Sequence, residues 1–367
     1  MCNLLISKKM KKNIFKKLFI KISKLAGYEL IDQNEFYSPT LEKNLDEKLS
    51  NKNKSIVLPL GEVKLSKKIK NLSVIFRTNS NIDIWDQNKK RVFEEPKIEY
   101  VLRCLFSLIK SINRLKKENS SINVNLLIID DNSKSDNLNK IKDVLNKNHS
   151  KYLIINHKKE EHKEKIFENT NDQTFSNLSS LLKCFETAKK ENSDLIYFVE
   201  DDYLHFENSL ADMVNTYERV SSQSEKDIII CPCDYPFNYM SNEKTNILIG
   251  SKRHWRTTNQ TLCTFLTSKT LINKYWDNLR KTCEKRHNPF EKYLNEIYKQ
   301  EICISPIKSL SLHVTNINSS YGLAPFINLK EFILQINNSI PKTLISGLGG
   351  FNPALRNLEP LPAAVNK

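Results

Sequence analysis

Short apolar runs alternate along the chain with longer segments in which apolar residues recur every three or four positions. Continuous apolar runs rich in β-branched and aromatic residues predict buried strands, and the longer periodic segments predict amphipathic helices. Alternation of the two is typical of a parallel sheet with helices on both faces. The sequence therefore predicts an α/β fold with a mostly parallel central sheet and flanking helices. The expected strands are 72–78, 124–130, 152–155, 195–200 and 227–231, and the expected helices are 97–118, 136–147, 175–190 and 206–219.

The pattern after residue 231 is less regular and predicts fewer elements. Alternating polar and apolar residues predict strands at 257–264 and 309–313. A helix is expected to open at Asn288, with Asn288 as N-cap, Pro289 at the first helical position and Glu291 closing a capping box. The charged run 157–165 contains two histidines, His157 and His162, which we expect to be solvated.

The strand expected at 195–200 ends in three consecutive acids, Glu200, Asp201 and Asp202. Three carboxylates at the end of a buried strand repel one another and lose hydration, unless water, a cation or the donors of a ligand meet them. A divalent metal that carries a diphosphate is one such partner, because Mg²⁺ is held by one or two carboxylates plus phosphate oxygens. A strand that runs out into a solvated acidic turn is the alternative.

Two other expected strands end in polar groups at the same edge of the sheet. The strand at 124–130 ends in Asp130 and Asp131, and the strand at 72–78 ends in Arg77 and Thr78. Ligands of open α/β sheets bind outside the carboxyl ends of the strands. These residues are therefore the candidate binding groups.

The three strand ends also resemble a known family. Val74-Ile-Phe-Arg-Thr, Ile128-Ile-Asp-Asp-Asn-Ser and Phe198-Val-Glu-Asp-Asp are similar, in order and spacing, to the nucleotide-sugar glycosyltransferases of the GT-A fold, family 2 above all. The resemblance covers 70–210 well and 211–330 loosely. Two departures prevent transfer of the donor sugar and the acceptor: Arg77-Thr78 stands in place of Pro-Thr, and the glycine-rich acceptor segment is absent.

The resemblance implies roles for individual residues. Asp130 and Asp131 would hold the nucleoside, with Arg77 and Thr78 at the same edge. The acidic triplet would be the DXD motif, in which Asp202 binds Mn²⁺ or Mg²⁺ while Glu200 and Asp201 support ribose or metal-bound water. A late histidine, His313, would complete the metal shell. An acid at a helix start, Glu291, would be the catalytic base, with Asp234 as the next candidate. Two of these residues have a simpler explanation. Glu291 would be an ordinary helix cap, and His313 a hydrogen-bonded residue at a strand end.

The loop 234–239 and the segment around Trp255 and Arg256 are the candidate acceptor contacts. Aromatic residues of the loop would stack on a sugar ring, or would simply plug the end of the sheet. Trp255 and Arg256 would contact acceptor or phosphate, or would belong to an ordinary edge strand.

Glycine and cysteine usage excludes several classes of site. No glycine occurs between Gly61 and Gly250, so the glycine-rich phosphate cradle of dehydrogenases and P-loop kinases is absent. The cysteines lie mostly inside apolar runs and are expected to be core residues of a protein from a reducing compartment. Cys231 and Cys233 lack a second pair at zinc-site spacing.

Composition suggests four regions. Residues 1–27 predict a basic amphipathic helix over 8–26, capped by Gly27, which either lies on an anionic membrane or packs on the main domain. Residues 28–67 are a polar linker, 68–335 the main α/β domain and 336–367 a Gly/Pro-containing tail. A net charge of +15 suits anionic partners but does not by itself indicate nucleic-acid binding.

Together these patterns predict a metal-dependent glycosyltransferase that moves a sugar from a nucleotide-diphosphate donor to the hydroxyl of a glycan, lipid-linked or other acceptor in glycoconjugate synthesis. We expect a cytoplasmic location, either free or at the inner face of the membrane. Two alternatives are a sugar-phosphate nucleotidyltransferase, for which a glycine-rich loop after the first strand is missing, and a non-enzymatic basic adaptor on membrane or nucleic acid.

Overall fold

The computed structural model describes residues 14–28, 55–58, 61–81, 96–148, 151–167, 172–240, 244–315, 317, 319–325 and 327. The chain divides into two units, Met1–Val63 and Lys64–Lys367. The tail expected at 336–367 lies outside the described residues.

The first unit contains the predicted amphipathic helix, α1 (Ile14–Leu25). Gly27 has a φ of 84° and its N–H bonds the carbonyl of Lys24, while the N–H of Tyr28 bonds the carbonyl of Ser23. This pair of bonds is the Schellman motif, in which glycine adopts the left-handed conformation at low cost, so the predicted cap is confirmed. Among the described residues, no helix is long and apolar enough to cross a membrane.

A two-stranded sheet follows within the segment expected to be irregular. It is formed by β1 (Ser55–Leu58) and β2 (Gly61–Lys64). The linker predicted at 28–67 therefore contains regular structure near its end.

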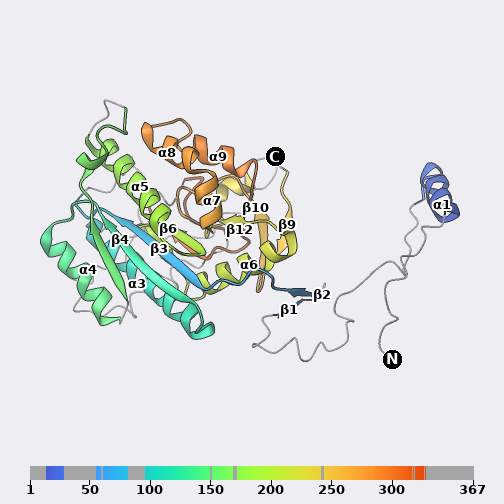
Figure 1. Ribbon diagram of the computed structural model, residues 1–367, viewed down its shortest axis with the longest axis horizontal. Helices are drawn as coiled ribbons and strands as arrows, with labels where there is room; N and C mark the ends of the chain where they lie inside the picture. The colour runs from blue at the N-terminus through green and yellow to red at the C-terminus, as the bar shows by residue number, and fades with distance from the viewer. Residues whose placement is uncertain are drawn as a thin grey trace, which may run out of the picture. The chain divides into compact units, whose positions relative to one another are not determined.

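The second unit is built on a nine-stranded sheet in the order β5-β4-β3-β6-β11-β8-β12-β10-β9 (Figure 1). The antiparallel pairings show that β10 and β11 run opposite to the other strands. The sheet is therefore mostly parallel, as predicted. Its strands are β3 (Asn71–Thr78), β4 (Asn123–Asp130), β5 (Tyr152–Asn156), β6 (Leu195–Glu200), β8 (Ile228–Ile230), β9 (Ile247–Ile249), β10 (His254–Thr257), β11 (Phe265–Ser268) and β12 (Ile302–Pro306).

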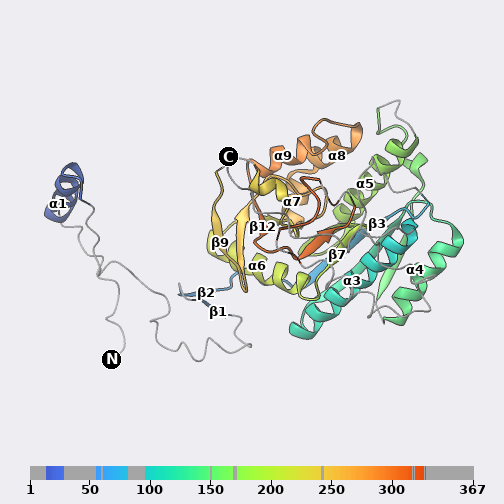
Figure 2. The ribbon, with the colours of Figure 1, turned by 180° about the vertical axis from the view of Figure 1, so that it is seen from behind.

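Helices cover both faces of this sheet, as the two opposite views show (Figures 1 and 2). Each face packs its own cluster of buried apolar side chains against its helices, with 0% exposure for residues such as Val74 on one face and Ile75 on the other. One layer contains α3 (Lys97–Glu118), α4 (Ser135–Lys147) and α6 (Ser209–Ser224), and the other contains α5 (Asp172–Lys190), α7 (Lys269–Lys274), α8 (Trp276–Glu284) and α9 (Lys292–Tyr298).

Most elements of the first half agree with the sequence, and several of the second half do not. Residues 258–264 form a loop between β10 and β11 rather than the predicted strand. Leu262 and Cys263 have φ values of 51° and 59° there, which a strand does not allow. The helix expected at 206–219 begins at Ser209 and continues to Ser224.

The predicted helix cap at Asn288 is also wrong. Helix α9 begins at Lys292, and no side chain caps its first turn. Glu291, which stands just before the helix, is 2% exposed and directs its carboxylate elsewhere.

The two histidines of the charged run are buried, not solvated. His157 and His162 are 2% and 1% exposed, because His157, directly after β5, and His162, at the end of the 3-10 helix η2 (Lys159–His162), both pack against Ser179 of α5. Their charged neighbours remain at the surface, so charge density along this run was a poor guide to burial.

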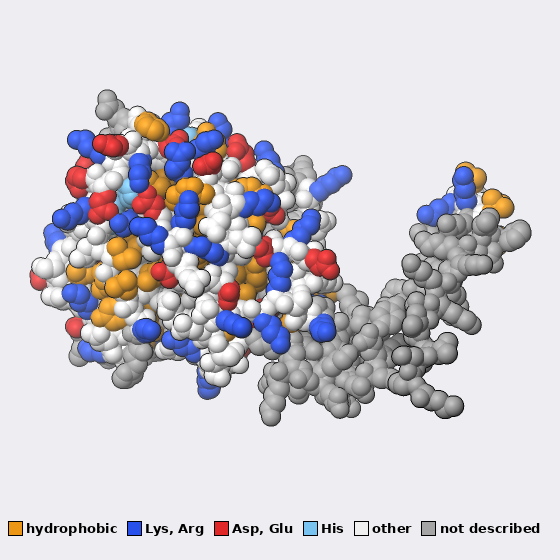
Figure 3. Space-filling view, in the orientation of Figure 1, with side chains coloured by type: hydrophobic (Ala, Val, Ile, Leu, Met, Phe, Trp, Pro, Cys, Tyr) orange, Lys and Arg blue, Asp and Glu red, His pale blue; other side chains and the backbone are white. Residues whose placement is uncertain are grey.

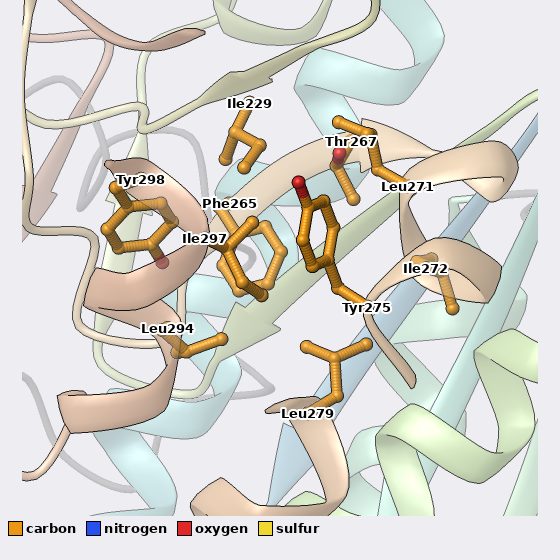
Figure 4. A pocket seen from close by; sticks show the side chains of 10 residues that line it. All are labelled: Ile229, Phe265, Thr267, Leu271, Ile272, Tyr275, Leu279, Leu294, Ile297 and Tyr298. Carbon is orange, nitrogen blue, oxygen red and sulfur yellow. The ribbon is translucent and has the colours of Figure 1, made fainter. Parts of the chain in front are cut away.

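A small apolar cavity of about 20 Å³ lies between the sheet and α7, α8 and α9 (Figure 4). Its lining includes the rings of Tyr275 and Tyr298, whose hydroxyls bond Glu301 at 2.6 Å and Thr261 at 2.7 Å. The space is comparable to one water molecule and offers no unpaired polar group, so it is a packing void rather than a nucleotide site.

Candidate functional site

The carboxyl ends of β3, β4 and β6 form one edge of the sheet. Thr78 of β3 pairs with Asp130 of β4, and Arg77 of β3 pairs with Glu200 of β6. Since side chains alternate between the faces of a strand, neighbouring residues at this edge point to different helix layers. The structure thus brings the predicted acids together at one edge, but divides them between two faces.

Each acid of the triplet is paired with a different cation of the chain. Glu200 forms an ion pair with Arg77, Asp201 with Lys97 at 2.5 Å, and Asp202 with His313 at 3.1 Å. The three cations come from β3, from the first turn of α3 and from β13 (Ser311–His313). The mutual repulsion expected from the sequence is therefore largely balanced within the protein.

On the α5 side, Arg77 is surrounded by acceptors. Besides Glu200, its guanidinium donates to the backbone and side-chain oxygens of Asn177 at 3.0 and 2.6 Å and to Ser180 at 3.2 Å. Burial alone would lower the pKa of Arg77, but Glu200 raises it overall. These bonds fix the first half of α5 to the sheet.

On the α3 side, Asp201 is held by three donors. Its Oδ2 accepts from the hydroxyl of Thr78 at 2.9 Å and from the N–H of Asn79 at 3.2 Å, and its Oδ1 accepts from Lys97. Burial alone would lower the pKa of Lys97, but Asp201 raises it, so the ammonium is charged.

Asp202 and His313, the two predicted metal ligands, are in direct contact. They are adjacent because β7 (Tyr203–His205) pairs with β13, with His313 opposite Tyr203. Oδ2 of Asp202 also accepts from Thr315 at 2.8 Å, while His313 Nδ1 lies 2.9 Å from the carbonyl of Tyr321. Burial alone would raise the pKa of Asp202, but His313 lowers it well below its usual range, and Asp202 in turn raises the pKa of His313.

Asp202 keeps one carboxylate oxygen for another partner. Its Oδ1 is buried and has no hydrogen-bond partner within the described structure. A buried carboxylate oxygen and a neighbouring imidazole are acceptable donors for Mn²⁺ or Mg²⁺. Within the described ranges, however, no three His, Cys, Asp or Glu side chains gather as a metal-binding group. The protein atoms of the described ranges would therefore supply only part of a coordination shell.

The acids after β4 are buried and retain one unused oxygen as well. Asp131 accepts from Asn79 at 3.1 Å and from Ser176 of α5, whereas Asp130 accepts from the N–H of Ser133 at 3.1 Å through Oδ2 alone. Oδ1 of Asp130 is buried without a partner. Burial raises the pKa of Asp130, and the neighbouring charges of Asp131 and Asp201 raise it further. Hydrogen-bond donors of a ligand would relieve this site.

Asp234, on the loop after β8, has similar properties. Its Oδ2 accepts from the hydroxyl of Tyr239 at 2.6 Å, and its buried Oδ1 has no partner in the described structure. Burial raises its pKa, although Arg256 acts in the opposite direction. Arg256 lies over the ring of Tyr239 at 4.6 Å and donates to the carbonyl of Asn238 at 2.8 Å. Trp255, by contrast, is fully buried in the core, so the expected acceptor contact through it is wrong.

Both carboxylate oxygens of Glu291 accept hydrogen bonds from the loop before β11. Its Oε1 accepts from the hydroxyl of Thr261 at 2.8 Å and from the N–H of Cys263 at 2.9 Å, and its Oε2 accepts from the N–H of Thr261 at 3.2 Å. Burial raises its pKa overall despite these bonds. The carboxylate therefore stabilises the left-handed turn at Leu262 and Cys263.

Several residues of the site were missed by the sequence analysis. Lys97, Asn79, Ser176 and Thr315 each bond one of the predicted acids. The position of Lys97 was a usable signal, because the helix that follows a parallel strand begins at the carboxyl edge of the sheet. Ser176 and Thr315 carried no comparable signal in the sequence.

No family model and no curated protein sequence matches this chain. Solved structures are similar to it at low identity. Residues 1–349 of TarS from S. aureus share 12% identity over 66% of this chain and 59% of that one, with a TM-score of 0.38. The galactosyltransferase LgtC, in complex with donor and acceptor sugar analogs, shares 10% identity over 63% of this chain and 72% of that one, with a TM-score of 0.34. The inositol-1-phosphate CTP transferase from T. maritima shares 12% identity over 75% of this chain and 99% of that one, with a TM-score of 0.37.

This chain spans about 59% of the length of the TarS structure. The fold rests on its own strand order and directions. The predicted α/β fold, with a mostly parallel central sheet and flanking helices, is confirmed.

Proposed function

We propose that this protein is a glycosyltransferase that moves a sugar from a nucleotide-diphosphate donor to an acceptor hydroxyl. The observation that carries the proposal is the edge formed by β3, β4 and β6. Four buried or nearly buried aspartates gather there, and Asp130 and Asp202 each keep one buried oxygen without a protein partner in the described structure. A nucleotide would supply the missing partners through its nucleoside hydroxyls and a phosphate-bound cation.

In this proposal different residues of the edge bind different parts of the donor. Asp130 and Asp131 receive the nucleoside, and Thr78 and Asp201 line its phosphate side. Asp202 and His313 hold Mn²⁺ or Mg²⁺, which neutralises charge on the leaving diphosphate when bound. Arg77 and Glu200 do not contact the donor in this proposal. They pair with each other, and the bonds of Arg77 to α5 hold the ends of β3 and β6 in place.

Asp234 is our first candidate for the base that deprotonates the acceptor. Its unpaired oxygen and its raised pKa suit proton abstraction. The hydroxyl of the next residue, Tyr235, lies 2.7 Å from that of Tyr203, which follows Asp202 in the chain. Glu291 becomes the second candidate, since both its oxygens already accept hydrogen bonds.

The proposed setting is the cytoplasm, with a glycan or lipid-linked acceptor and no nucleic-acid partner. The seven cysteines within the described residues are buried and unpaired, as expected in a reducing compartment. Basic side chains on the face seen in Figure 3 are interspersed with acidic ones rather than gathered in a single stripe, which does not favour a nucleic-acid track.

Metal-dependent nucleotide binding tests the proposal. We expect one or more of UDP, CDP, GDP and ADP to raise the melting temperature in the presence of Mn²⁺. Asp202→Asn should remove the Mn²⁺-dependent part of this shift and weaken binding at least about tenfold, because the site loses its anionic ligand. Asp277→Asn, at a side chain that is 77% exposed, is the matched control.

Two results would reject the assignment. One is an unchanged Mn²⁺-dependent shift in folded Asp202→Asn protein, and the other is the absence of any nucleotide-induced shift in the wild type. Release of pyrophosphate from a nucleoside triphosphate and a sugar phosphate would instead identify a nucleotidyltransferase.

A further inference from the structure

The three cations that neutralise the acidic triplet differ in how many hydrogen bonds they have already made. Arg77 donates to Glu200, to both oxygens of Asn177 and to Ser180. The ring nitrogens of His313 face Tyr321 on one side and Asp202 and Thr315 on the other. The Nη1 group of Arg77 and both ring nitrogens of His313 are therefore already engaged with protein acceptors.

Lys97 is different. Within the described part of the chain, its ammonium bonds Oδ1 of Asp201 at 2.5 Å. An ammonium has three N–H donors, so two remain beyond this bond. Its side chain is 16% exposed, compared with 10% for Asp201 and 10% for His313, so it is partly accessible from solvent.

The surroundings of Lys97 also fix where its charge lies. It stands in the first turn of α3, which reaches the carboxyl edge of the sheet, and Asp201 is itself anchored by Thr78 and by the N–H of Asn79. An ammonium held by such a carboxylate is positioned before any ligand arrives, which lowers the ordering cost of binding.

We propose that Lys97 binds the diphosphate of the nucleotide donor through the N–H groups that Asp201 does not occupy. This inference rests on the proposed function and adds a residue that it does not include. Phosphate is the ligand that suits a partly exposed ammonium next to an acid-lined nucleoside site, because lysine recognises phosphate as a point charge. Part of the nucleotide affinity should then persist without a divalent cation.

Calorimetric titration in EDTA tests this directly. The wild type would be titrated with uridine, cytidine, guanosine and adenosine and with the four diphosphates. We expect at least one diphosphate to bind without metal, about tenfold or more tighter than its nucleoside. In Lys97→Met this preference for the diphosphate should disappear, whereas Lys97→Arg should retain it because the charge remains. Lys117→Met, at an exposed position near the end of the same helix, should behave like the wild type.

The ratio of the two affinities separates phosphate binding from a purely structural role. Loss of Lys97 alone leaves Asp201 as an unpaired anion that would itself repel a diphosphate, so the ratio should fall in Lys97→Met under both readings. The double variant Lys97→Met/Asp201→Asn removes both charges and leaves no unpaired acid. Its ratio should stay reduced if Lys97 binds phosphate, and should return to the wild-type value if Lys97 only neutralised Asp201.

The failures of the two proposals are distinguishable. A wild type that binds no diphosphate with Mn²⁺ or with EDTA rejects the glycosyltransferase proposal and this inference with it. A wild type that binds diphosphates with Mn²⁺ but shows no preference over nucleosides in EDTA rejects the role of Lys97 alone. An unchanged ratio in Lys97→Met, or a wild-type ratio in Lys97→Met/Asp201→Asn, has the same meaning.

Discussion

The acids after β6 differ in what they can still bind. Both oxygens of Asp201 accept bonds from the protein, while Asp202 keeps Oδ1 unpaired within the described structure. A side chain whose oxygens are all used contributes to the shape of a site, and a buried oxygen without a partner is costly until a ligand satisfies it. This difference favours Asp202 as the residue that coordinates a metal ion and Asp201 as the residue that orders its surroundings. The two side chains are chemically identical and adjacent in sequence.

The same reasoning distinguishes the two candidate bases. Asp234→Asn should lower turnover about 10²-fold or more at nearly constant donor affinity, because a neutral amide cannot take the acceptor proton.

Glu291→Gln should instead act on stability, because its amide NH₂ would face the N–H of Cys263 or of Thr261. A loss of about 1–3 kcal/mol is expected from one such unsatisfied donor.

Denaturant unfolding and donor hydrolysis measure the two effects separately. Glu296→Gln, on the partly exposed side of α9, is the control for Glu291→Gln. If Glu291→Gln kept its stability and lost turnover while Asp234→Asn remained active, the roles would be the reverse of those proposed. Hydrolysis is the practical first assay, since the acceptor remains to be found.

Among the elements, α5 has the most connections to the site. Ser176 bonds Asp131, and Asn177 and Ser180 bond Arg77. Within the same stretch of the helix, the hydroxyl of Ser179 lies 2.9 Å from His157 and 2.9 Å from His162. The helix therefore holds the ends of β3 and β4 and a pair of buried histidines through neighbouring side chains.

These histidines predict a pH dependence of stability. Burial, together with the neighbouring His162, lowers the pKa of His157 to about 4, whereas in the unfolded chain a histidine titrates near 6.5. The folded state thus favours the neutral form, so His157 contributes stability above about pH 6.5 that is lost as the pH falls from 6.5 towards 4. Glu160 and Glu161 oppose this lowering of the His157 pKa, and Lys183 assists it.

Chemical unfolding at several pH values measures this contribution. The wild type should lose about 1–3 kcal/mol more than His157→Asn between pH 6.5 and pH 4. The exposed His254 provides the control, and His254→Asn should follow the wild type. Parallel pH profiles for wild type and His157→Asn would contradict a neutral buried His157.

At the scale of the whole molecule, local pattern predicted the first half better than the second. Strands such as β3 and β6 and the helix α3 are long, continuous or strongly periodic, so local sequence is sufficient to define them. The turn before β11 depends on Glu291, 28 residues from Cys263, and the contact between Asp202 and His313 depends on the pairing of β7 with β13. Such long-range contacts leave no periodic signal.

For the candidate site, too, local sequence predicted positions along strands but not long-range contacts. Which acids stand at strand ends could be read from the sequence, because the parallel strands of a sheet end at one edge. Which of them remain unpaired could not, since Lys97 and Thr315 reach Asp201 and Asp202 from α3 and from the segment after β13.

The first unit of the chain has its own prediction. Helix α1 exposes Leu18, Phe19, Ile22 and Leu25, with 83% exposure at Leu25, and lysines interrupt this apolar sequence (Figure 3). A helix with an apolar face and lysines beside it suits an anionic bilayer surface. Removal of residues 1–27 should therefore lower affinity for phosphatidylserine vesicles by about 1 kcal/mol per lost lysine that contacts the surface.

Vesicle cosedimentation at low and high salt measures this difference. The full chain should bind phosphatidylserine vesicles more tightly than phosphatidylcholine vesicles, and salt should weaken the binding because charges at a surface are screened. The truncated chain should keep its nucleotide-induced thermal shift, since the strand ends of the site all lie in Lys64–Lys367. Equal vesicle binding by both forms would reject the anchor, while a truncated chain that loses its thermal shift would show that residues 1–27 support the fold of the second unit. The first result leaves the catalytic proposal intact, because nucleotide binding and membrane binding are assigned to different units.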